Sequence, residues 1–223
     1  MQEWLNLHGV GLVVDGDFGP ITERQVKKFQ TLKNIGQSGQ VDQITFEKMT
    51  EPMNAVLSPG AQAGESFADC VVRIAKLHLQ IHPMEIGGQN RGPWVRMYMN
   101  GNQGINWPWC AGFVTFLMKQ ASELLGDAMP IKGSFSCDSL AAQAKASGRF
   151  VKESNAIAAG LPDGSLFLVR RTSTDWTHVG MVLGATSGFF ETIEGNTNDE
   201  GSHEGYEVCK RVRGYARKDF ILL

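Results

Sequence analysis

The chain changes its pattern of apolar residues at about Gly160, and this change limits the folds that it can adopt. Before Gly160, apolar residues recur at helical spacing in several segments. After it come short extended runs separated by turn residues, over residues 166–169, 178–183, 189–194, 206–212 and 220–223. Short runs of this kind predict an antiparallel sheet. Helices first and strands afterwards predict an α+β domain.

Capping signals mark the ends of two expected helices. Ser66 followed by Asp69 has the form of a capping box, and apolar residues recur at helical spacing over 67–81. Pro108 suits a first helical turn, because it presets φ and lacks the amide hydrogen that such a turn leaves unpaired. The apolar spacing after it continues to Gly126, a residue type that commonly ends helices.

The first fifty residues predict a separate small module. Three short helices are expected there, around residues 4–7, 20–32 and 45–49. Residues 51–65 are dominated by small residues and helix breakers, as in a linker. We therefore predict an all-α domain over 1–50, a linker over 51–65 and the α+β domain over 66–223.

The overall composition excludes several classes of protein. The 223 residues are 42% hydrophobic and 20% charged, with a formal net charge of -2. Binding to nucleic acid or to a membrane surface usually shows a basic excess, so neither is expected. No apolar run approaches the roughly 18 residues of a membrane span. The N-terminus lacks the basic start and apolar core of a secretory signal, so the sequence does not predict an export route.

The four cysteines are widely scattered, at positions 70, 110, 137 and 209. The chain has no CxxC pair, which argues against a zinc ribbon or a thioredoxin-type motif. Disulfides among Cys70, Cys137 and Cys209 stay open. For Cys137, which has no proline or aromatic frame around it, we expect a packing role.

Two pairs of residues invite a metal-site interpretation, and neither has the full pattern. Asp15 and Asp17 lack the later carboxylates of a calcium-binding loop. His78 and His82 are four apart on a predicted helix, but Leu79 stands where a metalloprotease motif has glutamate. We predict no metal and no cofactor.

Cys110 lies where a turn becomes a helix, in the stretch NWPWCAGFV of residues 106–114. The unpaired amides and the positive end of the helix dipole at such a position favour a thiolate. The alternative is a buried structural cysteine. Trp109 and Trp176 are candidate walls of a substrate groove, and either could equally belong to the core.

A base for this thiol is available on the predicted strands. A nucleophilic cysteine needs a nearby base, and the base needs a group that orients its ring. His178 opens one strand, and Glu194 and Asn196 share a face near the end of the next. If the strands pair, either residue can reach the imidazole. Taken singly, His178 could be an ordinary strand histidine and Glu194 an exposed carboxylate.

The N-terminal module resembles the three-helix peptidoglycan-binding domain. The resemblance rests on D-G-D-F-G-P-x-T over residues 15–22, V-K-x-F-Q over 26–30 and Q-V-D-x-x-T over 40–45. It implies that this module holds an attached enzyme on the cell wall.

The second domain resembles the CHAP family of cysteine, histidine-dependent amidohydrolases and peptidases from about residue 67 to 223. The matching segments are residues 90–93 (NRGP), 108–114 (PWCAGFV), 177–182 (THVGMV) and 193–197 (IEGNT). The resemblance implies a papain-like fold with helices packed on an antiparallel sheet. It also implies that Cys110 is the nucleophile, His178 the base, Glu194 the orienting acid and Asn196 an accompanying polar residue.

Together these patterns predict a peptidoglycan hydrolase that acts at the bacterial cell wall or periplasm. It would cleave an amide bond of the peptide stem or cross-link through a thioester. The alternatives are an N-acetylmuramoyl-L-alanine amidase, a CHAP-type amidase acting on a small peptide conjugate, and a non-catalytic wall-binding protein. Peptidoglycan is the expected partner. A phage lysin, a secreted toxin and a housekeeping enzyme all fit, and a toxin would also have an immunity or inhibitor protein as partner.

Overall fold

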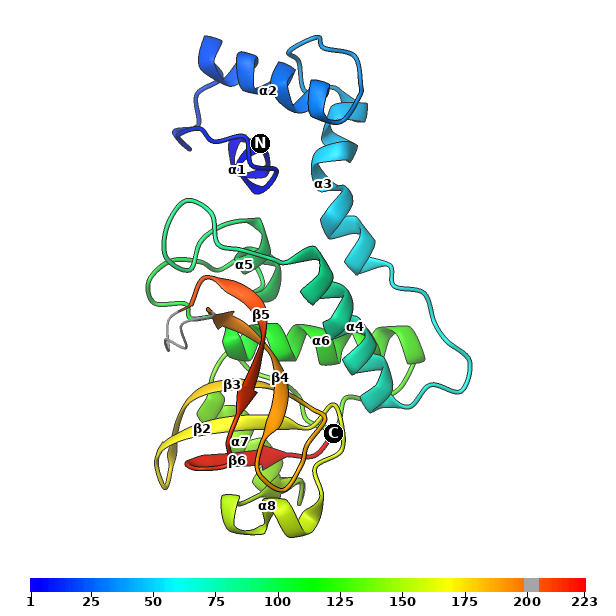
Figure 1. Ribbon diagram of the computed structural model, residues 1–223, viewed down its shortest axis with the longest axis vertical. Helices are drawn as coiled ribbons and strands as arrows, with labels where there is room; N and C mark the ends of the chain where they lie inside the picture. Colours follow the sequence, from blue (N-terminus) through cyan, green and yellow to red (C-terminus); the bar gives the residue numbers. More distant parts are fainter. Residues whose placement is uncertain (199–204) are drawn as a thin grey trace.

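The computed structural model describes residues 1–198 and 205–223. The helices in this part of the chain are α1 (Gln2–Leu7), α2 (Pro20–Leu32), α3 (Gln43–Leu57), α4 (Phe67–Ile81), α5 (Pro93–Tyr98), α6 (Cys110–Leu125), α7 (Cys137–Ala146) and α8 (Glu153–Ala159). The strands are β1 (Phe150–Val151), β2 (Leu166–Thr172), β3 (Asp175–Leu183), β4 (Phe190–Thr197), β5 (Glu207–Arg213) and β6 (Lys218–Ile221). Helices therefore precede a sheet, as Figure 1 shows, and the predicted α+β class is confirmed.

The strands form one antiparallel sheet in the order β1-β6-β2-β3-β4-β5. The five predicted extended runs correspond to β2 through β6, with ends that differ by a few residues. Sequence analysis missed β1, α5 and α8. These elements are two to seven residues long, too short for apolar periodicity to distinguish them from loops.

Local sequence explains where the longer helices start and stop. The Ser66 hydroxyl accepts a hydrogen bond from the Asp69 amide at the start of α4, as the capping box predicts. Gly126 ends α6 in the left-handed conformation, at φ 73°. The hydroxyl of Ser136 caps α7 in the same manner as Ser66 caps α4.

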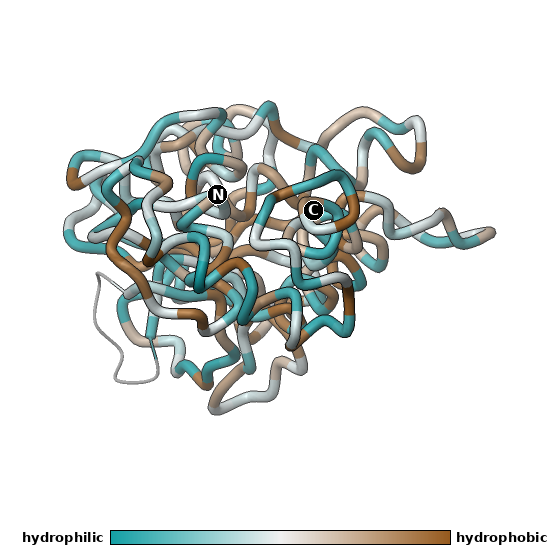
Figure 2. The backbone as a smooth tube through the Cα atoms, turned by 90° about the horizontal axis from the view of Figure 1, so that it is seen from above, coloured by the Kyte–Doolittle hydropathy of each residue, from teal (hydrophilic) through white to brown (hydrophobic). Residues whose placement is uncertain are grey.

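Two apolar cores lie on opposite faces of the sheet. On one face, α6 and α7 cover Val179, Met181 and Leu183 of β3, and α4 packs against β4 and β5. On the other face, Val182 and Phe167 pack with residues of α8 and β6. Successive strand residues point to opposite faces, so β3 contributes to both cores. Figure 2 shows apolar and polar stretches alternating along the chain, as expected when each element turns one side inward.

The N-terminal module has its own core, and buried glutamines tie its loops to its helices. The core residues are Leu5, Val10, Val26, Phe29 and Met49. The side chain of Gln2 donates to Asp15 Oδ1 at 2.7 Å and accepts from the Gly16 amide. Gln30 donates to Thr45 Oγ1 at 3.0 Å and accepts from the Gly39 amide. The polar positions of the D-G-D and F-Q patterns thus hold the turns of this fold.

The helix α3 extends into the expected linker. It continues past Pro52 to Leu57, so residues 51–57 are helical rather than irregular. Val56, near its end, is buried in the core of the second domain, and its carbonyl accepts a hydrogen bond from Gln120 Nε2 at 2.9 Å. The helix therefore connects the two domains physically as well as along the chain.

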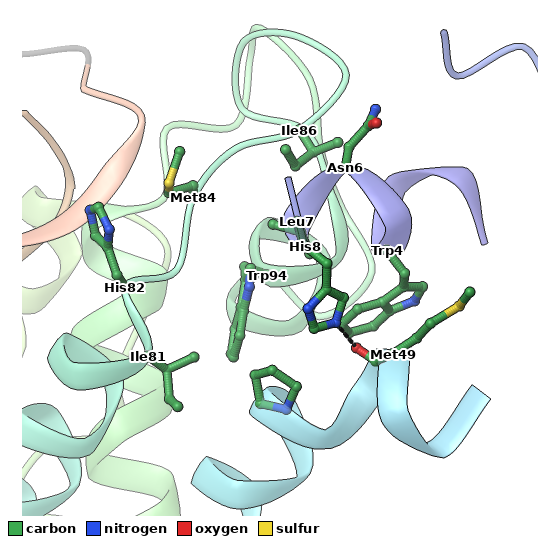
Figure 3. Close-up of a pocket in the computed structure, with 11 residues that line it drawn as sticks. Trp4, Asn6, Leu7, His8, Met49, Ile81, His82, Met84, Ile86 and Trp94 are labelled. Atoms are coloured by element: carbon green, nitrogen blue, oxygen red, sulfur yellow. Dashed lines mark hydrogen bonds between the residues drawn. The ribbon is translucent and has the colours of Figure 1, made fainter. Parts of the chain in front are cut away.

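A further contact joins the two domains beside a small pocket. Arg96 of α5 donates two hydrogen bonds to the Glu3 carboxylate, at 3.0 and 2.6 Å. The pocket has a volume of about 110 Å³ and is walled by Trp4 and His8 on one side and Trp94 on the other (Figure 3). The N-terminal module therefore contacts the second domain through α1 and α3, and α5 supplies part of the facing surface.

We expect Leu117→Ala to lower the free energy of unfolding by ~3 kcal/mol, because it leaves a cavity under the sheet. Leu117 is fully buried in α6. It lies about two helical turns after the candidate nucleophile, Cys110. Chemical denaturation would measure the change in the free energy of unfolding. Lys119→Ala, at a position on the same helix that is 67% exposed, is the matched control, with an expected change within about 0.5 kcal/mol. Equal effects of the two substitutions would contradict this packing.

Candidate active site

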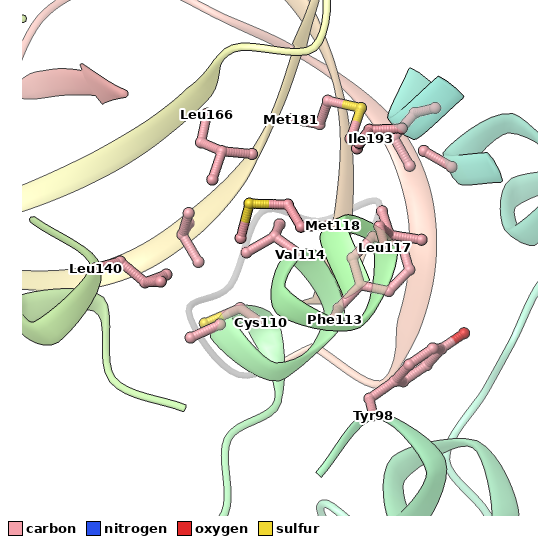
Figure 4. Packing of buried hydrophobic residues seen from close by; sticks show 14 of the residues in the cluster. Tyr98, Cys110, Phe113, Val114, Leu117, Met118, Leu140, Leu166, Met181 and Ile193 are labelled. Carbon is pink, nitrogen blue, oxygen red and sulfur yellow. The ribbon is translucent and has the colours of Figure 1, made fainter. Parts of the chain in front are cut away.

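Cys110 is the first residue of α6 and is nearly buried, with 4% of its surface exposed. The Phe113 amide donates to the Trp109 carbonyl at 2.8 Å and closes the first helical turn. Figure 4 shows the cysteine at the start of the helix, with Val114 and Met118 further along it. The position predicted from Pro108 is thus the one observed. A helix N-terminus has unpaired amides and a positive dipole end, which favour a negative charge at this position.

The strands β3 and β4 bring His178 and Glu194 together where their backbone pairing stops. Backbone pairing covers only Met181–Leu183 and Glu191–Ile193. Beyond it, the side chains bridge the strands, and His178 Nε2 lies 2.8 Å from Glu194 Oε2. The other ring nitrogen, Nδ1, is buried and has no hydrogen-bond partner among the described residues. It is therefore free to exchange a proton with a thiol.

Gly180 makes room for this bridge. A Cβ atom at this position would lie 2.7 Å from Glu194 Cγ and 2.7 Å from Phe167 Cε1. The glycine of the H-V-G pattern therefore leaves the space in which the Glu194 side chain reaches His178. Any larger residue would displace the Glu194 side chain.

Arg213, which sequence analysis missed, holds the carboxylate of Glu194. Its Nε donates to Oε1 at 2.7 Å and its Nη2 to Oε2 at 2.6 Å. Thr192 Oγ1 donates to Oε1 at 2.5 Å. Glu194 has no exposed surface, so these donors replace water around its charge. Only the pairing of β4 with β5 brings the arginine here, and no pattern along the chain signals it.

The charged residues of the site shift each other's pKa values toward the ionised forms. Burial raises the pKa of Glu194, but the hydrogen bonds from Arg213 and His178 outweigh it and lower the value to about 2. Burial lowers the pKa of His178, but the charge of Cys110 and the bond to Glu194 outweigh it and raise the value to about 9. At neutral pH the acid is thus ionised and the imidazole is protonated.

Cys137 lies beside the candidate nucleophile. It belongs to the buried core, as expected, and its Sγ also lies 4.0 Å from the Sγ of Cys110. A hydrogen bond from the Cys137 thiol lowers the pKa of Cys110 well below its usual value, burial opposes this shift, and the charge of His178 adds to it. Cys137 itself keeps its proton, because the same hydrogen bond and burial raise its pKa. Cys110 is therefore the thiolate of the pair.

The other predicted site residues lie around this centre without joining it. Asn196 is buried in a left-handed conformation at φ 54°, and its side-chain amide has no hydrogen-bond partner among the described residues. It makes no bond to His178.

Trp109 is fully buried and stacks on Tyr98 with ring centroids 5.4 Å apart. Trp176 is 6% exposed and donates from Nε1 to Asp219 at 2.9 Å. Both tryptophans are therefore part of the core and do not wall a groove.

The two histidines at the end of α4 do not converge on one site. His78 is buried and bonds to Tyr98 and Gln120, whereas His82 ends the helix and pairs with Glu207. Within residues 1–198 and 205–223, no group of three or more His, Cys, Asp and Glu side chains is placed to hold a metal ion. The helices of this part of the chain are also too short or too polar to cross a membrane.

Comparisons with known proteins identify the N-terminal module. Residues 1–49 match the family described as a putative peptidoglycan binding domain. This match supports an N-terminal peptidoglycan-binding domain, association with the cell wall and peptidoglycan as the partner. No CHAP family model matches the chain. No curated protein and no solved structure matches it either.

We expect Cys110 to be a thiolate at neutral pH, because Cys137, His178 and the helix N-terminus all favour its charged form. The ultraviolet absorption of the wild-type protein at pH 7 should exceed that of Cys110→Ala by one thiolate. In His178→Gln, the titration of this absorption should move upward, toward the usual thiol pKa of 9.0. A wild-type spectrum at pH 7 identical to that of Cys110→Ala would contradict the assignment.

We expect Arg213→Gln to lower the free energy of unfolding at pH 7 by ~3 kcal/mol, because it leaves a buried carboxylate short of donors. The pKa of Glu194 is depressed from 4.5 to about 2. Its stabilising contribution is therefore present above pH 4.5 and lost as the pH falls toward 2. The difference between variant and wild type should shrink over the same window, as denaturation at several pH values would show. Lys210→Gln, which removes an exposed ion pair with Glu191, should change little.

Proposed function

We propose that the protein is a cell-wall hydrolase whose second domain is a CHAP-like cysteine amidohydrolase or peptidase. The observation that carries the proposal is the buried chain of contacts from Arg213 through Glu194 to His178, ending beside a cysteine at a helix start. A strand histidine or a strand-end carboxylate with only a structural role would not need this arrangement. The peptidoglycan-binding domain at residues 1–49 supplies the substrate class.

The residues can be assigned to the steps of amide hydrolysis. The Cys110 thiolate attacks the amide carbonyl, and the backbone amide of Cys110 is placed to donate to the developing oxyanion. Protonated His178 gives its proton to the leaving amine, and a thioester forms on the sulfur. His178, now neutral, removes a proton from the water that hydrolyses the thioester. Glu194 orients the ring and stabilises the imidazolium throughout.

Aromatic residues other than the two predicted tryptophans are suited to line the approach to the sulfur. Trp107 lies three residues before Cys110, and Phe135 two residues before Cys137. Their rings meet edge to face with centroids 6.4 Å apart, and Phe135 is 39% exposed. This pair stands on the two segments that lead into the thiols, where a bound peptide stem would pass.

Fusion to the N-terminal peptidoglycan-binding domain would hold the enzyme on its substrate. Peptidoglycan is insoluble, and a tether raises the effective concentration of the catalytic site at its surface. The packing of α3 and Glu3 against the second domain would hold the two sites at one spacing. Such an arrangement favours cleavage near the point of attachment.

The function is tested by turbidity loss of purified cell walls. The wild-type protein should clear them, whereas Cys110→Ala should not, and His178→Ala should be slower by a factor of ~10²–10⁴. Both variants should still sediment with walls, because the binding domain is untouched. Equal clearing by wild type and Cys110→Ala would leave the non-catalytic wall-binding function as the better account.

Mass spectrometry of the digested walls separates the two activities within the proposed class. New N-terminal alanine would mark an N-acetylmuramoyl-L-alanine amidase. Cleavage within the stem or cross-link would mark an endopeptidase. Both reactions use the same chemistry at an amide carbonyl, so their products are what distinguish them.

A further inference from the structure

Two helices begin at cysteines whose sulfur atoms nearly touch. Cys110 starts α6 and Cys137 starts α7, and their Sγ atoms are 4.0 Å apart. Both side chains are buried, and neither cysteine is in a disulfide. A disulfide needs a sulfur separation of about 2.05 Å, so the two sulfur atoms have to approach each other by about 2 Å for the bond to form.

The two thiols differ in the way that a disulfide-forming pair requires. Cys110 lies at the amide end of its helix beside the His178 ring, which makes it the more reactive sulfur. Cys137 faces that sulfur, as a second thiol that resolves an oxidised partner must, and oxidation of Cys110 removes the charge that helps to raise the pKa of Cys137. Cys70 has no such setting, because it lies beside the Glu65–Arg73 ion pair and burial raises its pKa to about 11.

We propose that Cys110 and Cys137 form a reversible disulfide under oxidising conditions, which removes the nucleophile and switches the enzyme off. The formation of the bond rests on the geometry of the thiols alone, and the loss of activity rests on the proposed function. A protein that associates with the cell wall works where disulfides persist, unlike one kept in a reducing cytoplasm.

The chemistry balances with hydrogen peroxide as the oxidant. The Cys110 thiolate attacks one peroxide oxygen, the O–O bond breaks, and a sulfenic acid and hydroxide form. The Cys137 sulfur then attacks the Cys110 sulfur, the S–O bond breaks, and water leaves with the Cys137 proton. Two thiols have lost two electrons to the peroxide. A dithiol reductant returns the electrons and restores both thiols.

The disulfide can be mapped without any assay of activity. After peroxide treatment and alkylation under denaturing conditions, trypsin should release residues 97–119 joined to residues 133–145. The joined mass should be two hydrogens below the sum of the two peptides and should disappear on reduction. Cys70→Ser, which changes a cysteine outside the pair, should give the same joined peptide.

Activity supplies the second measurement. Peroxide should abolish wall clearing by the wild type, and dithiothreitol should restore it. In Cys137→Ser, peroxide should convert Cys110 to sulfinic acid, which dithiothreitol does not reduce and which mass spectrometry detects whatever the activity of the variant. Cys137→Ala tests the same point if the serine variant folds poorly.

The outcomes separate the two proposals. If peroxide-treated wild type carries sulfinic acid on Cys110 and no joined peptide, the switch is wrong whatever the activity. If the joined peptide forms while the reduced protein clears no walls, the disulfide stands and the hydrolase function is wrong.

Discussion

The buried ion pair between Arg213 and Glu194 is the interaction on which the rest of the site depends. An ionised carboxylate without exposed surface is stable only if donors replace its water, and Arg213, Thr192 and His178 together supply them. The charge of Cys110 and the hydrogen bond to this carboxylate together raise the pKa of the His178 imidazole above its usual range. The imidazolium in turn stabilises a thiolate at Cys110. One arginine on the edge strand β5 thus supports, through Glu194 and His178, the charge of a sulfur to which Cys137 also donates a hydrogen bond.

Close backbone approach is the second requirement, and glycine meets it at two points. Gly180 leaves the space that the Glu194 side chain occupies between β3 and β4. Gly195 lets β4 lie against α6, where a Cβ atom would come 2.7 Å from Phe113 Cγ and 2.8 Å from Trp109 Cζ3. The two glycines therefore position the acid relative to both the base and the helix that carries the nucleophile.

The tryptophan before the nucleophile has a structural role that complements these contacts. Trp109 stacks on Tyr98 and donates from Nε1 to Glu85 at 2.8 Å. Tyr98 bonds through its hydroxyl to His78, the buried histidine of α4. This aromatic and polar network anchors the start of α6 to α4 and α5. Because Trp109 directly precedes Cys110, this anchoring also fixes the position of the cysteine.

The sequence by itself determined the α+β class, the three-helix module, the start of α6 at Cys110 and the placing of His178 and Glu194 on successive strands. Each of these follows from local rules, namely capping, turn chemistry and apolar periodicity, which act over a few residues. The tertiary structure alone decided that Arg213 supports the acid, that Cys137 faces the nucleophile and that Trp109 and Trp176 are core. Strand pairing and helix packing bring these residues together across long stretches of chain, and no periodicity along the chain records such contacts.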